Sequence, residues 1–267
     1  MHETNILTLA LRMAKEAGDL IAGQRKSLSL SYKNGSELVT QADVAADELI
    51  TATIRRNYPD HQILSEELNP DELVNAGQQE HLWIVDPIDG TVNFAHGHPQ
   101  VAVSIAYYHK GKARVGVVHN PFMDETFHAQ AGKGARLNDL PIHCSEKTDL
   151  ARSIIATGFP YEIDNLPLLM KRLEQVLAHC ADIRRLGSAA LDICWVACGR
   201  LDGYYESVKP WDFAAAQLIA REAGASFGHI QTLSEETNPE LCGDNILIAA
   251  PPLFSPLQAL LRKAEPY

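Results

Sequence analysis

The most constraining feature of this sequence is an apolar strand that runs directly into a pair of aspartates. Residues 82–85, Leu-Trp-Ile-Val, are followed by Asp86, Pro87, Ile88 and Asp89. A buried strand would deliver Asp86 at its carboxyl end, and Pro87 would stop the strand there because proline has no N–H to give to a neighbouring strand. Asp89 follows within one tight turn, so the two carboxylates can converge on one cation or take one cation each.

The residues after this turn add groups suited to an anion. Gly90 allows the backbone to approach a ligand closely, and Thr91 offers a hydroxyl. If a helix begins near Thr91, its free N–H groups form an anion site beside the cations. Asp-Pro and Asp-Gly are also ordinary turn dipeptides, which is the plainer interpretation of either one alone. Their combination behind a four-residue apolar strand favours a site for cations and phosphate.

Two further acidic positions lie where predicted elements begin or end. Glu66 and Glu67 follow a short strand at 61–65, and Asp212 opens a helix within Lys-Pro-Trp-Asp. An exposed acidic loop and a simple helix cap are the alternative explanations. Sites in α/β folds gather at such ends of elements. Four carboxylates in one pocket would repel each other, and hard oxygen ligands of this kind suit Mg²⁺.

The pattern of apolar residues predicts an α/β fold, a layered α+β sandwich of helices and mixed sheets. Strands joined by short turns come first, and strands alternating with helices follow. No break in composition divides the chain, so a single domain over residues 1–267 is expected. Helices are expected at 5–25, 42–56, 166–179, 188–198, 211–223 and 254–263. Strands are expected at 28–33, 61–65, 82–85, 101–109, 113–119, 125–129, 135–137, 153–157, 183–186, 202–206 and 246–250.

Charge and cysteine content argue against several classes of protein. The net charge is −11 and no run of Lys or Arg is present, so nucleic-acid binding is not expected. An acidic protein can still bind an anionic substrate if bound metals reverse the local sign of the field. No stretch approaches the ~20 apolar residues of a membrane helix, and the N-terminal residues lack the pattern of a secretory signal. The five cysteines form no Cys-x-x-Cys pair. These features predict a cytoplasmic protein without a membrane partner.

Taken together, the acidic motifs resemble the inositol monophosphatase family over nearly the whole chain. The segments that carry the resemblance are Tyr32-Lys33, Glu66-Glu67, Asp86-Pro-Ile-Asp-Gly-Thr-Val-Asn-Phe and Pro210-Trp-Asp. The resemblance implies a sugar-phosphatase fold, a homodimer, and Mg²⁺-dependent hydrolysis of a phosphate monoester on a small polyol. Inositol monophosphate is the expected substrate, attacked directly by a metal-activated water.

The resemblance also implies a metal-binding role for each matching acid. Glu66, Asp86 and the main-chain carbonyl of Ile88 would hold a first metal. Asp86, Asp89 and Asp212 would hold a second, and Glu66 would help to bind a third. Two Mg²⁺ ions, with a third held loosely, are therefore the expected cofactors.

Further matching positions would handle the water and the substrate. Glu66, Thr91 and Asp86 form the implied catalytic group, in which Thr91 and Glu66 orient and deprotonate the water. The amides of Gly90 and Thr91 would bind phosphate oxygens, and Ala189 would contact a sugar hydroxyl. The implied substrate-binding residues are Asp89, Gly90, Thr91, Ala189, Glu206 and Asp212.

A supporting group and two departures complete the resemblance. Lys33, Thr40 and Asp43 resemble the loop and helix start that support the third metal and the water. Val92 stands where the family usually has threonine, beyond the ligands. Glu206 is one residue closer to the Pro-Trp-Asp motif than the family pattern has it, which bears directly on its contact with the sugar.

Other functions fit parts of the pattern. A phosphatase of the haloacid dehalogenase type also ends a buried strand with Asp-x-Asp-Gly-Thr, but here the two acids are three residues apart rather than two. Within the family, the alternative substrates are fructose 1,6-bisphosphate, histidinol phosphate and adenosine 3′,5′-bisphosphate, and Asn93-Phe94 favours the inositol branch. A regulatory binding partner with secondary phosphatase activity is the alternative from another class.

Overall fold

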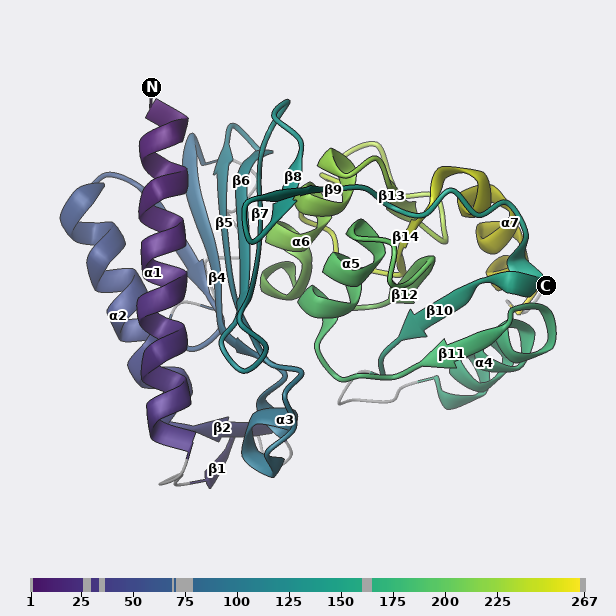
Figure 1. The fold of residues 1–267 in the computed structure, drawn as a ribbon, viewed down its shortest axis with the longest axis horizontal. Coiled ribbons are helices and arrows are strands. Elements are labelled where there is room, and N and C mark those ends of the chain that lie inside the picture. Colours follow the sequence, from purple (N-terminus) through teal and green to yellow (C-terminus); the bar gives the residue numbers. More distant parts are fainter. Residues whose placement is uncertain are drawn as a thin grey trace.

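Helices and sheets alternate in five layers, which Figure 1 shows nearly edge-on. The computed structural model describes residues 2–25, 30–33, 37–68, 70, 79–159 and 165–264, and only the backbone of residues 2, 30–33 and 37–39. None of the described helices is both long and apolar enough to cross a bilayer.

A seven-stranded mixed sheet forms the second layer. Its strand order is β3-β4-β5-β6-β7-β8-β9, with β3 parallel to β4 and the other neighbours antiparallel. The strands are β3 Gln62–Ser65, β4 His81–Asp89, β5 Ala102–His109, β6 Lys112–Asn120, β7 Glu125–Gln130, β8 Ala135–Leu137 and β9 Leu140–Ile142. One face packs against α1 (His2–Gln24) and α2 (Gln41–Asn57). A small hairpin of β1 (Leu30–Lys33) and β2 (Glu37–Thr40) leads into α2.

The other face of this sheet packs on a central pair of helices, α5 (Ala189–Ala197) and α6 (Pro210–Glu222). These two helices also cover a five-stranded mixed sheet of order β11-β10-β12-β14-β13. Its strands are β10 Ile154–Thr157, β11 Asp182–Arg184, β12 Gly203–Glu206, β13 Ser226–His229 and β14 Ile246–Ala249. Helices α4 (Leu166–His179) and α7 (Pro251–Arg262) close the outer face.

Burial on both sides explains the composition of the central elements. In β5, Val103, Ile105 and Tyr107 pack toward α1 and α2, whereas Ala102, Ala106 and Tyr108 pack toward α5 and α6. Successive residues of a strand point to opposite faces, so a strand covered on both faces is apolar throughout. The central helices α5 and α6 are buried on nearly all sides for the same reason.

Helix α6 lies unusually close to the seven-stranded sheet because Gly116 of β6 has no side chain. A Cβ atom at position 116 would stand 2.5 Å from the carbonyl oxygen of Ala215 in α6. Ordinary van der Waals contact begins near 3.4 Å, so only glycine allows this approach. The helix that begins with Pro-Trp-Asp is therefore seated directly on the sheet.

The layered sandwich with mixed sheets confirms the predicted fold class, but one predicted boundary is wrong. Strand β4 does not stop at Asp86-Pro87; it continues to Asp89. Asp86 pairs with Ser104 and Asp89 pairs with Ala102, so three steps along β4 match two along β5. The extra residue forms a bulge that absorbs the proline, and pairing then resumes.

Several shorter elements differ from the sequence prediction as well. Strands β2, β9 and β13 were not predicted, because each is only three or four residues long and none has a sustained apolar run. The predicted strand at 28–33 corresponds to β1, and residues 28–29 lie outside the described residues. A short helix, α3 (Thr91–His96), begins where the sequence suggested, and a 3-10 turn, η3, covers Leu150–Arg152.

Candidate active site

Four predicted acids line one cleft between the central helices and the end of the seven-stranded sheet. Asp86, Asp89 and Asp212 each place a carboxylate oxygen within 4.8 Å of the others. Glu66, in the turn after β3, lines the same cleft, and its N–H donates to the carbonyl of Val85 at 3.2 Å. The parallel pairing of β3 and β4 thus brings the ends of both strands together.

The electrostatics of this cluster favour a bound cation. Burial raises the pKa of Asp86 well above its usual value, and the charges of Glu66, Asp89 and Asp212 raise it further. Burial, followed by the charge of Asp89, also raises the pKa of Asp212. Closely packed buried carboxylates can all be ionised only if a positive charge compensates them. Because the ligand atoms are all oxygen, the donor set fits a hard cation such as Mg²⁺.

Two of these acids also hold the beginnings of the central helices. One oxygen of Asp89 (Oδ2) accepts the hydroxyl of Ser188 at 2.5 Å and the N–H of Ala190 at 2.7 Å, at the start of α5. Oδ2 of Asp212 accepts the N–H of Lys209 at 2.7 Å, at the start of α6. A carboxylate at a helix N-terminus is favoured by the helix dipole. Each acid keeps its second oxygen for a cation.

The turn that carries Glu66 is held by Asp47, a residue that the sequence analysis missed. Asp47 is buried in α2, and its Oδ2 accepts the N–H groups of Glu67 and Leu68, both at 3.1 Å. The available signal was its position four residues after Asp43, which places both acids on one face of the helix. Asp47 therefore fixes where Glu66 lies relative to the cluster.

Thr91 joins the start of α2 to the cleft. Its hydroxyl lies 3.2 Å from Oδ1 of Asp43 and 3.1 Å from the carbonyl oxygen of Ile88. The other oxygen of Asp43 accepts the N–H and the hydroxyl of Thr40 at 2.8 and 2.5 Å. The structure thus brings Thr40, Asp43 and Thr91 together, as expected. The backbone of Lys33 pairs with Glu37 in the β1–β2 hairpin, and its side chain lies outside the described residues.

The turn between β4 and α3 requires glycine. Gly90 has a φ of 95°, and a Cβ atom there would stand 2.8 Å from the carbonyl oxygen of Gln100 and 3.0 Å from that of Gly187. Asn93 supports the turn, because its amide nitrogen donates to the carbonyls of Gln100 and Leu186. The turn is therefore tied to the segment that leads into α5.

Ala189 and Glu206 lie on the opposite side of the cleft from α2. The shorter spacing before Pro-Trp-Asp does not remove Glu206 from the cleft. The hydroxyl of Tyr204 donates to its Oε2 at 2.5 Å, and Gly158 lies directly against the carboxylate. Burial raises the pKa of Glu206 to about 7.

Two further residues of this side were missed from the sequence. Asp192 of α5 is 2% exposed, and its Oδ1 has no hydrogen-bond partner among the described residues. Arg185 also lines the cleft, with its guanidinium 5.8 Å from the ring centre of Phe159. The signal for Asp192 was an acid inside an otherwise apolar helix, where an unpaired carboxylate is costly without a ligand.

Comparison with known proteins places this geometry in a family. Residues 2–264 match the family model described as Inositol monophosphatase family. The chain belongs to this family. A relative named Nus factor SuhB, from Pasteurella multocida (strain Pm70), is 44% identical over 224 residues, covering 82% of this chain and 83% of the relative.

Two solved structures of relatives have the same fold. The extragenic suppressor protein suhB from Bartonella henselae has a TM-score of 0.86 and 34% identity, with 97% of this chain and 99% of that chain covered. The inositol monophosphatase from Anabaena has a TM-score of 0.83 and 33% identity, with coverage of 100% and 98%. Membership of the family supports a phosphatase activity.

Proposed function

We propose that this member of the inositol monophosphatase family is a Mg²⁺-dependent phosphatase acting on a small phosphorylated polyol, with inositol monophosphate as the favoured substrate. The observation that carries the proposal is the convergence of Asp86, Asp89 and Asp212 within 4.8 Å, in a cleft that Glu66 also lines. Such an acidic cleft repels a phosphate ester unless it binds cations first.

The metal ligands follow from the donor set. Glu66, Asp86 and the carbonyl oxygen of Ile88 would hold one Mg²⁺, and Asp86, Asp89 and Asp212 would hold a second. A third ion would bind more loosely near Glu66. Bound Mg²⁺ supplies a Lewis acid that neutralises phosphate charge and lowers the pKa of a coordinated water.

The protein groups around the cleft position the water and the phosphate. Thr91 accepts or donates a proton at its hydroxyl, which Asp43 and the Ile88 carbonyl hold in place. Glu66 provides a carboxylate that takes the proton of the attacking water. The amides of Gly90 and Thr91 stand at the start of α3, where backbone N–H groups bind phosphate oxygens. Phosphoryl transfer requires mainly this positioning and charge neutralisation.

The ties on Asp89 argue against a covalent aspartyl-phosphate route. One of its oxygens is bonded to Ser188 and Ala190, and the other faces Asp86 and Asp212. A nucleophilic carboxylate needs an oxygen directed at phosphorus rather than at a helix end or a cation. Direct attack by water is therefore the mechanism that this geometry supports.

On the polyol side, the cleft offers several hydrogen-bond acceptors. The carboxylates of Glu206 and Asp192 lie there beside Ala189, and Arg185 adds one positive charge. Acceptors of this kind suit the vicinal hydroxyls of a cyclitol or sugar. This arrangement supports inositol monophosphate over histidinol phosphate, whose leaving group carries an ammonium and an imidazole. Fructose 1,6-bisphosphate and adenosine 3′,5′-bisphosphate remain the alternatives for the test.

A substrate panel and an isotope experiment test the proposal together. With Mg²⁺ present, kcat/KM should be highest for inositol 1-phosphate, and chelation should abolish turnover. In a single turnover in ¹⁸O-water, the label should appear in phosphate and not in the protein. Label on Asp86 or Asp89 would establish the covalent route instead. Activity that persists after full chelation would remove the metal from the proposal.

A second candidate function rests on the relative named Nus factor SuhB. We infer that the chain can also act as a regulatory binding partner. An Asp86→Asn variant that loses turnover but keeps full cellular activity would support this role, whereas parallel loss of both would reject it. We also propose a single domain over residues 1–267 and a homodimer, for which sedimentation should give the mass of two chains.

A further inference from the structure

A second group of metal-binding side chains lies at the opposite end of β4 from the acidic cleft. Glu80 precedes β4, His81 is its first residue, and His109 is the last residue of β5. The register of the sheet pairs His81 directly with His109. Five residues separate His81 from Asp86, about 17 Å along an extended strand. The two groups are therefore separate sites.

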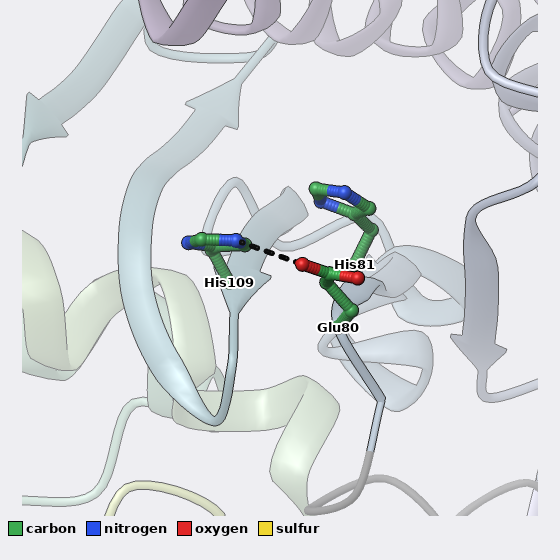
Figure 2. A group of neighbouring side chains, drawn as sticks. All are labelled: Glu80, His81 and His109. Atoms are coloured by element: carbon green, nitrogen blue, oxygen red, sulfur yellow. Dashed lines mark ion pairs between the residues drawn. The ribbon is translucent and has the colours of Figure 1, made fainter.

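The three side chains converge on one point. One candidate ligand atom from each of Glu80, His81 and His109 lies within 4.8 Å of the other two. Figure 2 shows the carboxylate of Glu80 between the two imidazole rings, with a dashed line to His109. Nε2 of His109 is 3.8 Å from Oε1 of Glu80. Tetrahedral ligands at 2.0–2.2 Å from a metal lie about 3.4 Å apart, so a small side-chain rotation closes the site.

The donor set differs in kind from that of the cleft. Two imidazole nitrogens and one carboxylate oxygen suit borderline metals such as Zn²⁺ and Cu²⁺, whereas Mg²⁺ prefers oxygen alone. Three protein ligands leave a position that water completes. We propose that Glu80, His81 and His109 form a transition-metal site of the Zn²⁺ and Cu²⁺ class, independent of the Mg²⁺ site.

The environment of His81 prepares the ring for coordination. Its Nδ1 lies 2.7 Å from the hydroxyl of Tyr107, which can accept the Nδ1 proton and so assign Nε2 to a metal. A second-sphere hydrogen bond of this kind fixes the tautomer and orientation of metal-binding histidines. The ring of His61 stacks on that of His81, with centroids 4.4 Å apart and planes at 16°. Stacking and hydrogen bond together restrict the rotation of His81.

His61 itself serves as a wall rather than a ligand. Its Nδ1 accepts the indole N–H of Trp83 at 3.0 Å, so a neutral His61 ring carries its proton on Nε2. The competing charge near the site is Lys110, whose Nζ is 3.3 Å from Oε1 of Glu80. Both side chains of that ion pair are more than 60% exposed, and exposed pairs contribute little to stability. A metal ion can therefore replace Lys110 at low cost.

Metal titration of the full chain tests the proposal. Chelator-treated protein is first given excess Mg²⁺, which occupies the carboxylate cleft, and is then titrated with Zn²⁺ against a chromophoric chelator. We expect one site whose affinity falls at least tenfold in His81→Gln and in His109→Gln. His179→Gln, which alters an exposed histidine at the end of α4, is the matched control and should keep the wild-type affinity.

Cu²⁺ provides an independent readout of the ligands. Its EPR spectrum in the wild type should show hyperfine coupling to two imidazole nitrogens, and each His→Gln variant should lose one of them. Glu80→Gln, at a largely exposed position, should weaken binding without changing the unfolding temperature of the metal-free protein. Equal Zn²⁺ affinity in the wild type and both histidine variants, or a Cu²⁺ spectrum without nitrogen coupling, would overturn the proposal. So would the absence of any Zn²⁺ binding in excess Mg²⁺.

Discussion

Replacing Asp89 with asparagine should stabilise the metal-free protein while removing most of its activity. Burial raises the pKa of Asp89 from 3.8 to about 6. A folded-state pKa above the unfolded-state value means that the ionised group destabilises the folded protein, and this penalty appears as pH rises from about 4 to about 6. At 1.36 kcal/mol per pKa unit, the penalty at neutral pH is on the order of 3 kcal/mol. Asparagine removes the charge and keeps an oxygen for Ser188 and Ala190.

Denaturant unfolding in excess chelator measures this effect. Near pH 8, Asp89→Asn should unfold with a free energy about 3 kcal/mol above that of the wild type, and the difference should vanish near pH 4. Its Mg²⁺-dependent kcat should fall about 10³-fold, or roughly 4 kcal/mol of transition-state stabilisation. Ser188→Ala is the control, because it removes a hydrogen bond and keeps the charge, so it should lose about 1 kcal/mol of stability.

The reasoning is refuted if the chelated variant and wild type are equally stable near pH 8. It is refuted equally by a variant that retains more than a tenth of the wild-type activity. The first result would mean that burial does not disfavour the ionised carboxylate, and the second that Asp89 is not a metal ligand.

Three other substitutions probe different parts of the site. Asp47→Ala removes the acceptor of two N–H groups in the Glu66 turn, a loss of about 1–3 kcal/mol, and should raise the Mg²⁺ concentration for half-maximal activity about tenfold. Asp47→Asn keeps an oxygen and should change it less, so identical Mg²⁺ titrations for the two variants would contradict this role. Asp192→Asn should raise KM for inositol 1-phosphate about tenfold with kcat nearly unchanged; an unaltered KM would show that Asp192 does not touch the substrate. Gly90→Ala should lower the free energy of unfolding by about 1–3 kcal/mol, because of its positive φ, and kcat about 10²-fold, and a variant with wild-type melting and turnover would disprove the close packing of this turn.

The sequence analysis succeeded where function and local structure share one short segment. Asp86, Asp89, Gly90 and Thr91 stand within six residues, so a single motif predicted a strand end, a turn and a helix start. The same motif led to the wrong end for β4. Proline forbids one ladder hydrogen bond, but the bulge between Asp86 and Asp89 removes the need for it, and no residue type announces a bulge.

Residues whose partners come from distant parts of the chain could not be found in this way. Asp47 acts on N–H groups about 20 residues further along, and a helix acid without a known partner reads as a solvated side chain. Asp192 faces a cleft whose other walls come from β4 and β12. Both acids have value only once the layers are assembled, and a single sequence does not specify how the layers meet.

The contact between Gly116 and α6 places a tight mechanical tolerance on catalysis. Asp86 and Asp89 belong to the seven-stranded sheet, whereas Asp212 arrives on α6, so the spacing between helix and sheet sets the width of the ligand cage. A single methyl group at position 116 would have to push the Ala215 carbonyl outward by about 0.9 Å, from 2.5 to 3.4 Å. Metal–ligand distances tolerate about 0.2 Å. An otherwise harmless alanine in the middle of β6, touching neither metal nor substrate, would therefore detune the enzyme from behind.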